Sequence, residues 1–229
     1  MQPFKMTMTL ASPVVMPFNT TLDGLLSFAG EALTGLRGAK LADVMPLARD
    51  VESGIFKASS IFLSNAAFYE NLVKVRALKH WDLDTQLIGP KKTKKGKVAR
   101  VPYPSIDKSR GDYANKLSVM TTLRTPLAAC YGVGDIETIE LWMQCILGLG
   151  RHAQQGQGEI VQLDISPMDA DLSWVNDDGL PQRPLPVNVW VRDGHALDGV
   201  TTTIAATQFP YWESPLESCV APLHTVIKL

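Results

Sequence analysis

The feature that most constrains the fold is a glycine-rich stretch from Gly148 to Gly158, which has four glycines in eleven residues. Glycine lacks a Cβ atom, so such a stretch can adopt positive φ angles and lie close to another backbone. The residues between the glycines include Arg151, His152, Gln154 and Gln155. These side chains carry donors suited to phosphate groups and base edges. The composition therefore favours binding of a polyanion over bond-breaking chemistry.

Other interpretations of this stretch follow from its spacing. A phosphate loop of the Walker A type ends in Gly-Lys-Ser/Thr, which is absent here. Gly148, Gly150 and Ala153 match the looser dinucleotide pattern G-x-G-x-x-A, but that pattern follows a strand and opens a helix. Here the predicted order is helix first and strand afterwards. A connection in which the glycines act only as turn and helix-capping residues stays open.

The segments on both sides have clear periodicity. Apolar residues at positions 136, 139, 142, 143, 146 and 147 predict a helix capped by Asp135 and closed by Gly148. Residues 159–165 read as a strand, and apolar residues alternate with polar ones over residues 4–11, which predicts a strand with one buried face. A helix begins after Thr20 or Thr21, with an apolar stripe at positions 22, 25, 26, 29, 32 and 33, and ends near Gly35.

The remaining periodic segments are shorter. Residues 55–63 predict a second strand, and residues 72–79 a third in which apolar and basic side chains alternate. An acidic, proline-punctuated connection covers residues 166–186. Two further strands are predicted at 187–191 and 201–206, in a final quarter that carries no motif.

Charge is distributed unevenly although the net charge is only −1. Residues 89–124 contain ten Lys or Arg against two Asp, and the remainder has 12 basic and 21 acidic residues. Six of these positive charges lie between Lys91 and Arg100, with no carboxylate among them. Such a segment has no hydrophobic period and cannot bury itself, so it predicts a loop or hairpin tip. An ordinary solvated loop is the alternative to a surface that binds a polyanion.

The order of these parts resembles a known superfamily. A helix, Gly-x-Gly-Arg, polar residues, Gly-x-Gly and a strand resemble the glycine-rich loop of the RAMP superfamily of CRISPR effector subunits. The strand at residues 4–14 and the helix opening at residues 21–26 fit the same superfamily, so the resemblance covers residues 4–166. Within it, the chain is most similar to the guide-handle-capping subunit of a type IV CRISPR effector.

The resemblance implies an α+β fold with a ferredoxin-like (RRM-like) domain over residues 1–166. It also implies a basic thumb insertion at about residues 86–118, which reaches across guide RNA. Residues 167–229 would form a small extension that is mostly β or irregular.

The resemblance further implies a non-catalytic subunit that binds and caps the 5′ handle of guide RNA and helps to assemble the effector for target DNA recognition. The expected RNA-binding residues are Gly150, Arg151, His152, Gln154, Gln155, Gly156, Gly158, Lys91, Lys92, Lys94, Lys95, Lys97 and Arg100. No cofactor and no metal are expected, because the three cysteines are widely spaced and the chain has no H-E-x-x-H.

Two other functions stay open. Some RAMP proteins cut precursor guide RNA without a metal, and here His80 or His152 would be the general base, helped by Tyr69, Lys74 or Arg151. The other is a sheet-based RNA-binding protein unrelated to CRISPR, although the aromatic consensus of an RRM is missing.

The expected partners are guide RNA, a RAMP-like backbone subunit and the large subunit of the complex, with target DNA contacted through the complex. The sequence has no apolar run of eighteen residues and no signal-peptide pattern, so we expect a cytoplasmic protein without membrane contact.

Overall fold

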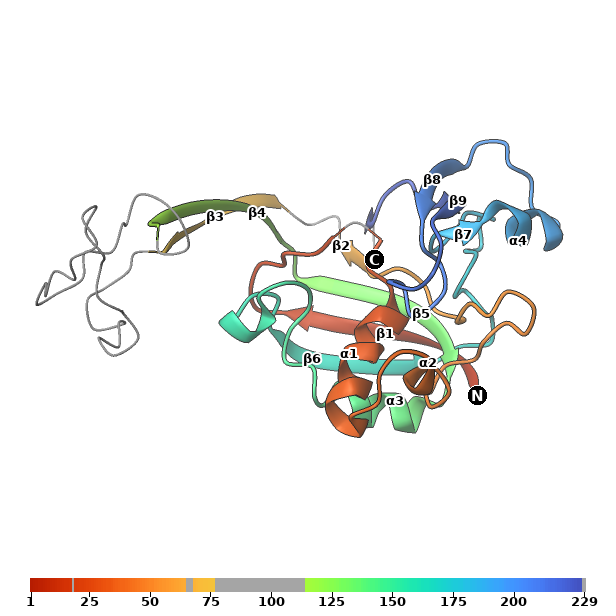
Figure 1. Cartoon of the computed structure of the whole chain (residues 1–229), viewed down its shortest axis with the longest axis horizontal. Helices are drawn as coiled ribbons and strands as arrows, with labels where there is room; N and C mark the ends of the chain where they lie inside the picture. Colours follow the sequence, from red (N-terminus) through yellow and green to blue (C-terminus); the bar gives the residue numbers. More distant parts are fainter. Residues whose placement is uncertain (18, 65–67, 77–113, 228–229) are drawn as a thin grey trace, which may run out of the picture. The chain divides into compact units, whose positions relative to one another are not determined.

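Figure 1 shows the computed structural model of the chain, which describes residues 1–17, 19–64, 68–76 and 114–227. The chain divides into one compact unit formed by Met1–Glu70 with Thr122–Leu229 and a second formed by Asn71–Thr121. Helices and strands are both present in the first unit, so the fold is α+β, as the sequence predicts.

The centre of the first unit is a five-stranded sheet with the strand order β10-β2-β5-β1-β6. Its strands are β1 (Gln2–Leu10), β2 (Phe62–Ser64), β5 (Leu127–Gly134), β6 (Ile160–Pro167) and β10 (Val226–Ile227). β1 is antiparallel to both of its neighbours, so Met6 lies opposite Cys130 of β5 and Ile165 of β6. The predicted strands at residues 4–11 and 159–165 are confirmed.

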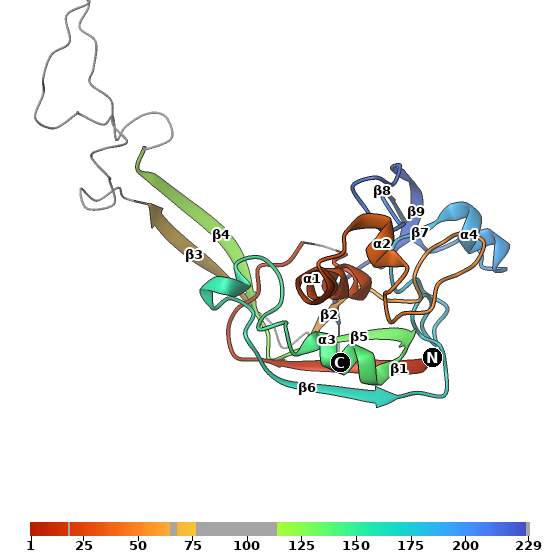
Figure 2. The same cartoon turned by 60° about the horizontal axis from the view of Figure 1, so that its bottom comes forward.

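Three helices, α1 (Leu22–Thr34), α2 (Gly38–Ala42) and α3 (Ile136–Met143), contribute to the core of this unit. Figure 2 shows α1 and α3 on the same face of the sheet. The alternation in β1 is confirmed, because Phe4, Met6, Met8 and Leu10 are all buried. The buried residues of α1 and α3 are Leu22, Asp23, Leu26, Ala29, Gly30, Ile139, Trp142 and Met143.

The helix ends differ in part from the sequence prediction. Thr21 and Asp135 occupy the N-cap positions, and Gly35 closes α1 in the left-handed conformation, as expected. The end of α1 is exposed at Ala32 and Leu33. The prediction that Gly148 closes the next helix is wrong, because α3 ends at Met143.

Strand pairing explains the early end of α3. The carbonyl of Leu147 accepts a hydrogen bond from the amide of Ile160 at 3.1 Å, and Gly148 forms a β-bridge with Glu159. Because Leu147 and Gly148 pair with the residues at the start of β6, they cannot form another turn of helix. Leu147 is exposed rather than buried.

The second predicted strand is much shorter than residues 55–63. Only Phe62–Ser64 form β2, while Phe56 and Ala58 make isolated bridges to Arg49 and Gly132. The segment is nevertheless part of the interior, since Ile55, Phe56, Ala58 and Ile61 are buried.

A two-stranded sheet is formed by β3 (Phe68–Arg76) and β4 (Lys116–Arg124). This confirms the strand predicted from residue 72 as far as Arg76, and the rest of that prediction lies outside the described residues. The apolar side chains of Val73, Val75, Leu117 and Val119 in this sheet are all exposed.

After β6, the chain forms a small sheet with the order β7-β9-β8 and a short helix. The elements are β7 (Leu185–Pro186), α4 (Val187–Arg192), β8 (Thr201–Ala205) and β9 (Glu217–Ala221). The strand at 201–206 is confirmed, but the strand predicted at 187–191 is wrong, because these residues form α4. Its valines favour a strand locally, yet the helix lets Val189 and Trp190 enter a second core cluster.

A buried ion pair joins this C-terminal part to α1. The side chains of Arg183 and Asp23 are 1% and 0% exposed, and Arg183 Nη1 lies 3.5 Å from Asp23 Oδ1. The guanidinium also donates to the carbonyls of Phe56 and Ala58 at 2.9 and 3.0 Å. Tyr211 donates its hydroxyl proton to Asp23 Oδ2. Burial raises the pKa of Tyr211, and the charge of Asp23 raises it further, so the hydroxyl keeps its proton.

Acid is expected to weaken the contact between α4 and the loop before Ile55. Burial raises the pKa of Asp50, but hydrogen bonds from the hydroxyl and amide of Ser53 and from Arg192 outweigh it and lower the pKa from 3.8 to about 2. Stability from this carboxylate is present above pH 3.8 and is lost as the pH falls through about 2.

We therefore expect Asp50→Ala to lower the free energy of unfolding by about 1–2 kcal/mol at pH 7. The difference from the native chain should shrink as the pH falls through 3, which urea unfolding at a series of pH values would measure. Glu52→Ala is the control, because that side chain is 74% exposed. A pH-independent difference for Asp50→Ala would contradict the assignment.

In the part of the chain that the structure describes, no helix is long and apolar enough to cross a membrane.

Candidate nucleic-acid interface

The glycine-rich loop is held by backbone hydrogen bonds to itself and to the segment that follows β1. The amide of Leu149 donates to the carbonyl of Gly158 at 2.8 Å, so the two ends of the loop are paired. The amide of Arg151 donates to Val15 at 2.6 Å, and the amide of Gly158 donates to Pro13 at 2.8 Å. The loop therefore has a defined backbone without a ligand.

The glycines of the loop serve different purposes. Gly150 and Gly158 have φ angles of 83° and 63°, and a Cβ atom on either would collide with the backbone of Val15 or Leu149. Both are therefore needed for packing inside the protein. Gly156 also has a positive φ, 82°, but a Cβ atom there would meet no described atom within 4 Å. Of these three predicted contacts, Gly156 is the one with open space above its backbone.

The tip of the loop is a single 3₁₀ turn, Ala153–Gln155. His152 precedes it with a φ of 64°, a conformation that costs a non-glycine residue of order 1–3 kcal/mol. Arg151, Gln154 and Gln155 are exposed, and His152 is half-buried. The amides of Gln155 and Gln157 both bond to the carbonyl of His152, which holds the turn in place. The loop thus presents polar side chains from a fixed backbone.

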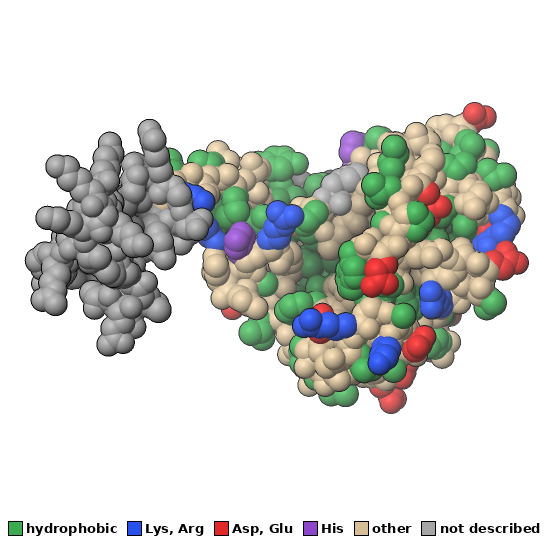
Figure 3. Space-filling view, viewed as in Figure 1, with side chains coloured by type: hydrophobic (Ala, Val, Ile, Leu, Met, Phe, Trp, Pro, Cys, Tyr) green, Lys and Arg blue, Asp and Glu red, His purple; other side chains and the backbone are tan. Residues whose placement is uncertain are grey.

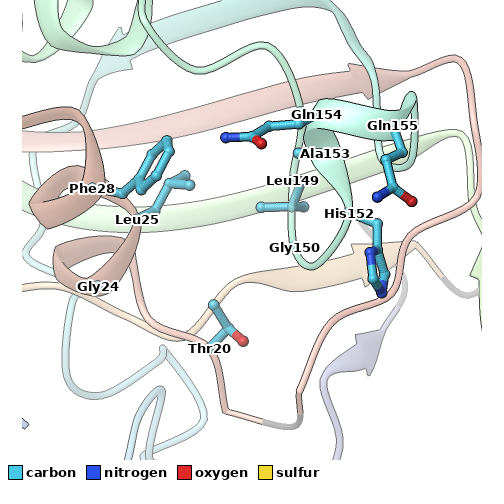
Figure 4. A pocket seen from close by; sticks show the side chains of 11 residues that line it. Thr20, Gly24, Leu25, Phe28, Leu149, Gly150, His152, Ala153, Gln154 and Gln155 are labelled. Atoms are coloured by element: carbon cyan, nitrogen blue, oxygen red, sulfur yellow. The ribbon is translucent and has the colours of Figure 1, made fainter. Parts of the chain in front are cut away.

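A cavity of about 430 Å³ lies between this loop and α1. Leu149, Gly150, His152, Gln154 and Gln155 line it from the loop. Thr20, Gly24, Leu25 and Phe28 line it from α1 and the residues just before it. Figure 4 shows the side chain of Gln154 extending from the loop toward Phe28 on the helix, with Leu25 beside Phe28 and Leu149 below Gln154. The cavity therefore combines an apolar floor with an amide at its rim.

The described residues that line this cavity include no Lys, Arg, Asp or Glu, although they include His152. Arg151 is the adjacent cation and is exposed. On the face shown in Figure 3, Lys and Arg side chains are interspersed with Asp and Glu, and neither sign of charge forms a continuous patch. A strongly basic surface is therefore not visible on that face of the described residues.

Four of the predicted RNA-binding residues of the loop line the cavity: Gly150, His152, Gln154 and Gln155. A fifth, Arg151, lies between Gly150 and His152 in the sequence but is not part of the lining. Gly156 and Gly158 lie in the same loop but do not line the cavity. The predicted contacts at Lys91, Lys92, Lys94, Lys95, Lys97 and Arg100 lie outside the described residues, as does the alternative base His80.

Sequence reasoning missed the contribution of α1. Leu25 belongs to the predicted core stripe, yet it is only partly buried and lines the cavity. Phe28 falls outside that stripe and is 59% exposed. The available signal was its spacing, because Phe28 lies three residues after Leu25 and four before Ala32 and therefore extends the apolar stripe at one edge.

The described ranges contain no candidate metal site. No cluster of three or more His, Cys, Asp or Glu side chains is placed there to hold a metal ion.

A comparison with protein families identifies the chain. The family model of the CRISPR type IV associated protein Csf3 matches residues 2–221. The chain belongs to the Csf3 family. It is therefore a RAMP-type subunit of type IV CRISPR complexes, in agreement with the resemblance seen in the sequence. No curated protein matches the chain. Membership of this family also removes the alternative of an RNA-binding protein unrelated to CRISPR.

Proposed function

We propose that this Csf3-family subunit binds guide RNA through the Gly148–Gly158 loop and caps its 5′ handle without cutting it. The observation that carries the proposal is a loop, fixed by backbone hydrogen bonds, that presents Arg151, Gln154 and Gln155 next to a cavity whose described lining includes no carboxylate. Arg151 would pair with a phosphate, and the amides would contact bases or sugars. The fixed backbone lowers the entropic cost of binding, because the loop is already ordered.

The arrangement of the first unit supports a ferredoxin-like domain. Along the chain the order is β1, α1, β2, β5, α3 and β6, and the sheet order of these strands is β2-β5-β1-β6. Two βαβ halves with antiparallel central strands and helices on one face are the features of that fold. In such a domain the loop after the second helix lies beside the first helix, where the cavity is found.

The lysine-rich segment would supply affinity that does not depend on sequence. If five of its lysines contact phosphates, the logarithm of the affinity should fall with the logarithm of salt concentration at a slope of about −3.5. Neutralising Lys91, Lys92, Lys94, Lys95 and Lys97 to glutamine should flatten the slope, measured by titrations at several salt concentrations. An unchanged slope would contradict a thumb that contacts RNA.

Contacts with a backbone subunit and the large subunit of the complex belong to the same proposal, with target DNA contacted through them. The exposed valines and leucine of β3 and β4 support a protein contact, because clustered exposed apolar side chains mark interaction surfaces. We also propose that the complex acts in the cytoplasm, in defence against foreign nucleic acid.

The proposal is tested by purifying the tagged protein from a host that expresses its genomic neighbours, followed by sequencing of the RNA that is retained. The expected result is a uniform short RNA with a fixed 5′ end, together with RAMP-like protein partners. Heterogeneous RNA, or no RNA, would overturn the handle-capping function while leaving the family membership intact.

Metal-independent cleavage of precursor guide RNA is the second candidate, because His152 lies at the cavity rim in a strained conformation. Against it, the imidazole of His152 makes no hydrogen bond to any described residue, so nothing there orients it as a general base. We expect no cleavage of precursor RNA by the purified complex. Cleavage that persists with a chelator and is lost in His152→Ala or His80→Ala would replace the capping proposal.

A further inference from the structure

We propose that the cavity between α1 and the glycine-rich loop holds one unstacked nucleobase of the bound RNA. This inference rests on the proposed guide-RNA function and goes beyond it, because it assigns a specific base-binding site. It depends on three properties of the cavity, namely its lining, its polar rim and its rigid frame.

The lining suits a flat aromatic ligand. Leu25 and Phe28 supply apolar surface, and Phe28 is 59% exposed although it belongs to a helix that packs on the core. An exposed ring costs free energy in water unless a ligand covers it. Single-stranded RNA is bound by stacking of splayed bases on aromatic side chains, which accept any base because every base has a π-face.

The rim supplies a hydrogen-bonding group. Gln154 is directed across the cavity toward Phe28, whereas Gln155 and His152 lie on the side away from it (Figure 4). A carboxamide carries both a donor and an acceptor, and so do the edges of nucleobases. Because the described lining has no carboxylate, the nearby phosphate would meet no repulsion there, and exposed Arg151 lies next to Gly150 in the sequence to neutralise it.

The frame of the cavity is already formed. Leu149 is fully buried, and its amide bonds to Gly158 at 2.8 Å. The next residue, Gly150, forms a parallel bridge with Val15. The floor therefore does not have to be ordered when a base enters, and little binding free energy is lost to reorganisation.

The test uses the assembled complex and a set of guide RNAs, each with a single abasic nucleotide at one position of the 5′ handle. For the native protein, one position should weaken binding by about 5- to 150-fold when its base is removed, as expected for loss of one stacked base. In Phe28→Ala, native RNA should bind as weakly as that abasic RNA does to the native protein, and removal of the same base should then have no further effect. Gln154→Ala should give a smaller loss that is also confined to that position.

Leu33→Ala is the matched control, because Leu33 is an exposed apolar residue of the same helix outside the cavity lining. It should keep the native abasic profile. A profile without a sensitive position, or a sensitive position that persists unchanged in Phe28→Ala, would overturn the base site while the RNA-binding function stands. Failure of the complex to bind any guide RNA would overturn the function itself, and the base site with it.

Discussion

Replacing Arg183 with methionine is expected to lower the free energy of unfolding by about 3–5 kcal/mol. Arg183 is 1% exposed, and the carboxylate of its partner Asp23 is fully buried. Removing the guanidinium leaves that charge without its counter-ion and takes away the hydrogen bond to the carbonyl of Ala58, whereas the carbonyl of Phe56 still accepts from the indole of Trp174. Equilibrium unfolding in urea would measure the loss.

Two further variants identify the cause. In the double variant Asp23→Leu/Arg183→Met no buried charge remains, so a large part of the lost stability should return. Arg192→Met is the matched single change, because Arg192 also forms ion pairs but is 33% exposed, and it should cost about 1 kcal/mol or less. Equal costs for Arg183→Met and Arg192→Met would show that burial does not determine the contribution of the pair.

This ion pair shows what sequence reasoning cannot reach. Asp23 was predictable as a favourable carboxylate in the first turn of a helix, where the dipole stabilises it. Its partner is 160 residues away in an acidic, proline-punctuated segment without a recognisable motif. Pairing between side chains so distant in the sequence depends on the tertiary fold, and local periodicity contains no information about it.

The strands also differ in whether the sequence alone predicts them. β1 was predictable because one face is buried and its apolar residues alternate, and β6 because Leu163 and Ile165 alternate with polar residues and pack, partly buried, against the core. The central strand β5 was not predicted, since it is rich in alanine and glycine and has consecutive buried residues at Ala128, Ala129 and Cys130. A strand covered on both faces loses its alternation, and small residues have little strand propensity of their own.

The candidate site was predictable only on one side. The loop was recognisable from its glycines and polar residues, but the cavity also needs α1, and Phe28 was not included in the predicted stripe although it lies three residues after Leu25 and four before Ala32. The role of each glycine was also hidden, because the sequence cannot show which positions face the chain's own backbone. The structure separates Gly158, which packs inside, from Gly156, which faces open space.

That separation gives the second large prediction. Gly158→Ala is expected to lower the free energy of unfolding by about 3 kcal/mol or more, because strain at positive φ adds to a collision with the backbone of Leu149. Gly156→Ala has only the strain and should cost about 1–2 kcal/mol. Urea unfolding of both variants would measure the difference.

Gly179→Ala completes the comparison, because Gly179 has a φ of 75°, an open environment among the described residues and a position outside the loop. Its stability loss should match that of Gly156→Ala. If RNA approaches the backbone at Gly156, only Gly156→Ala should also weaken guide-RNA binding, by about tenfold for 1.4 kcal/mol of lost contact. Equal stability losses at all three positions would contradict the packing role of Gly158. Unchanged RNA binding in Gly156→Ala would instead confine recognition to the side chains of the loop and its cavity.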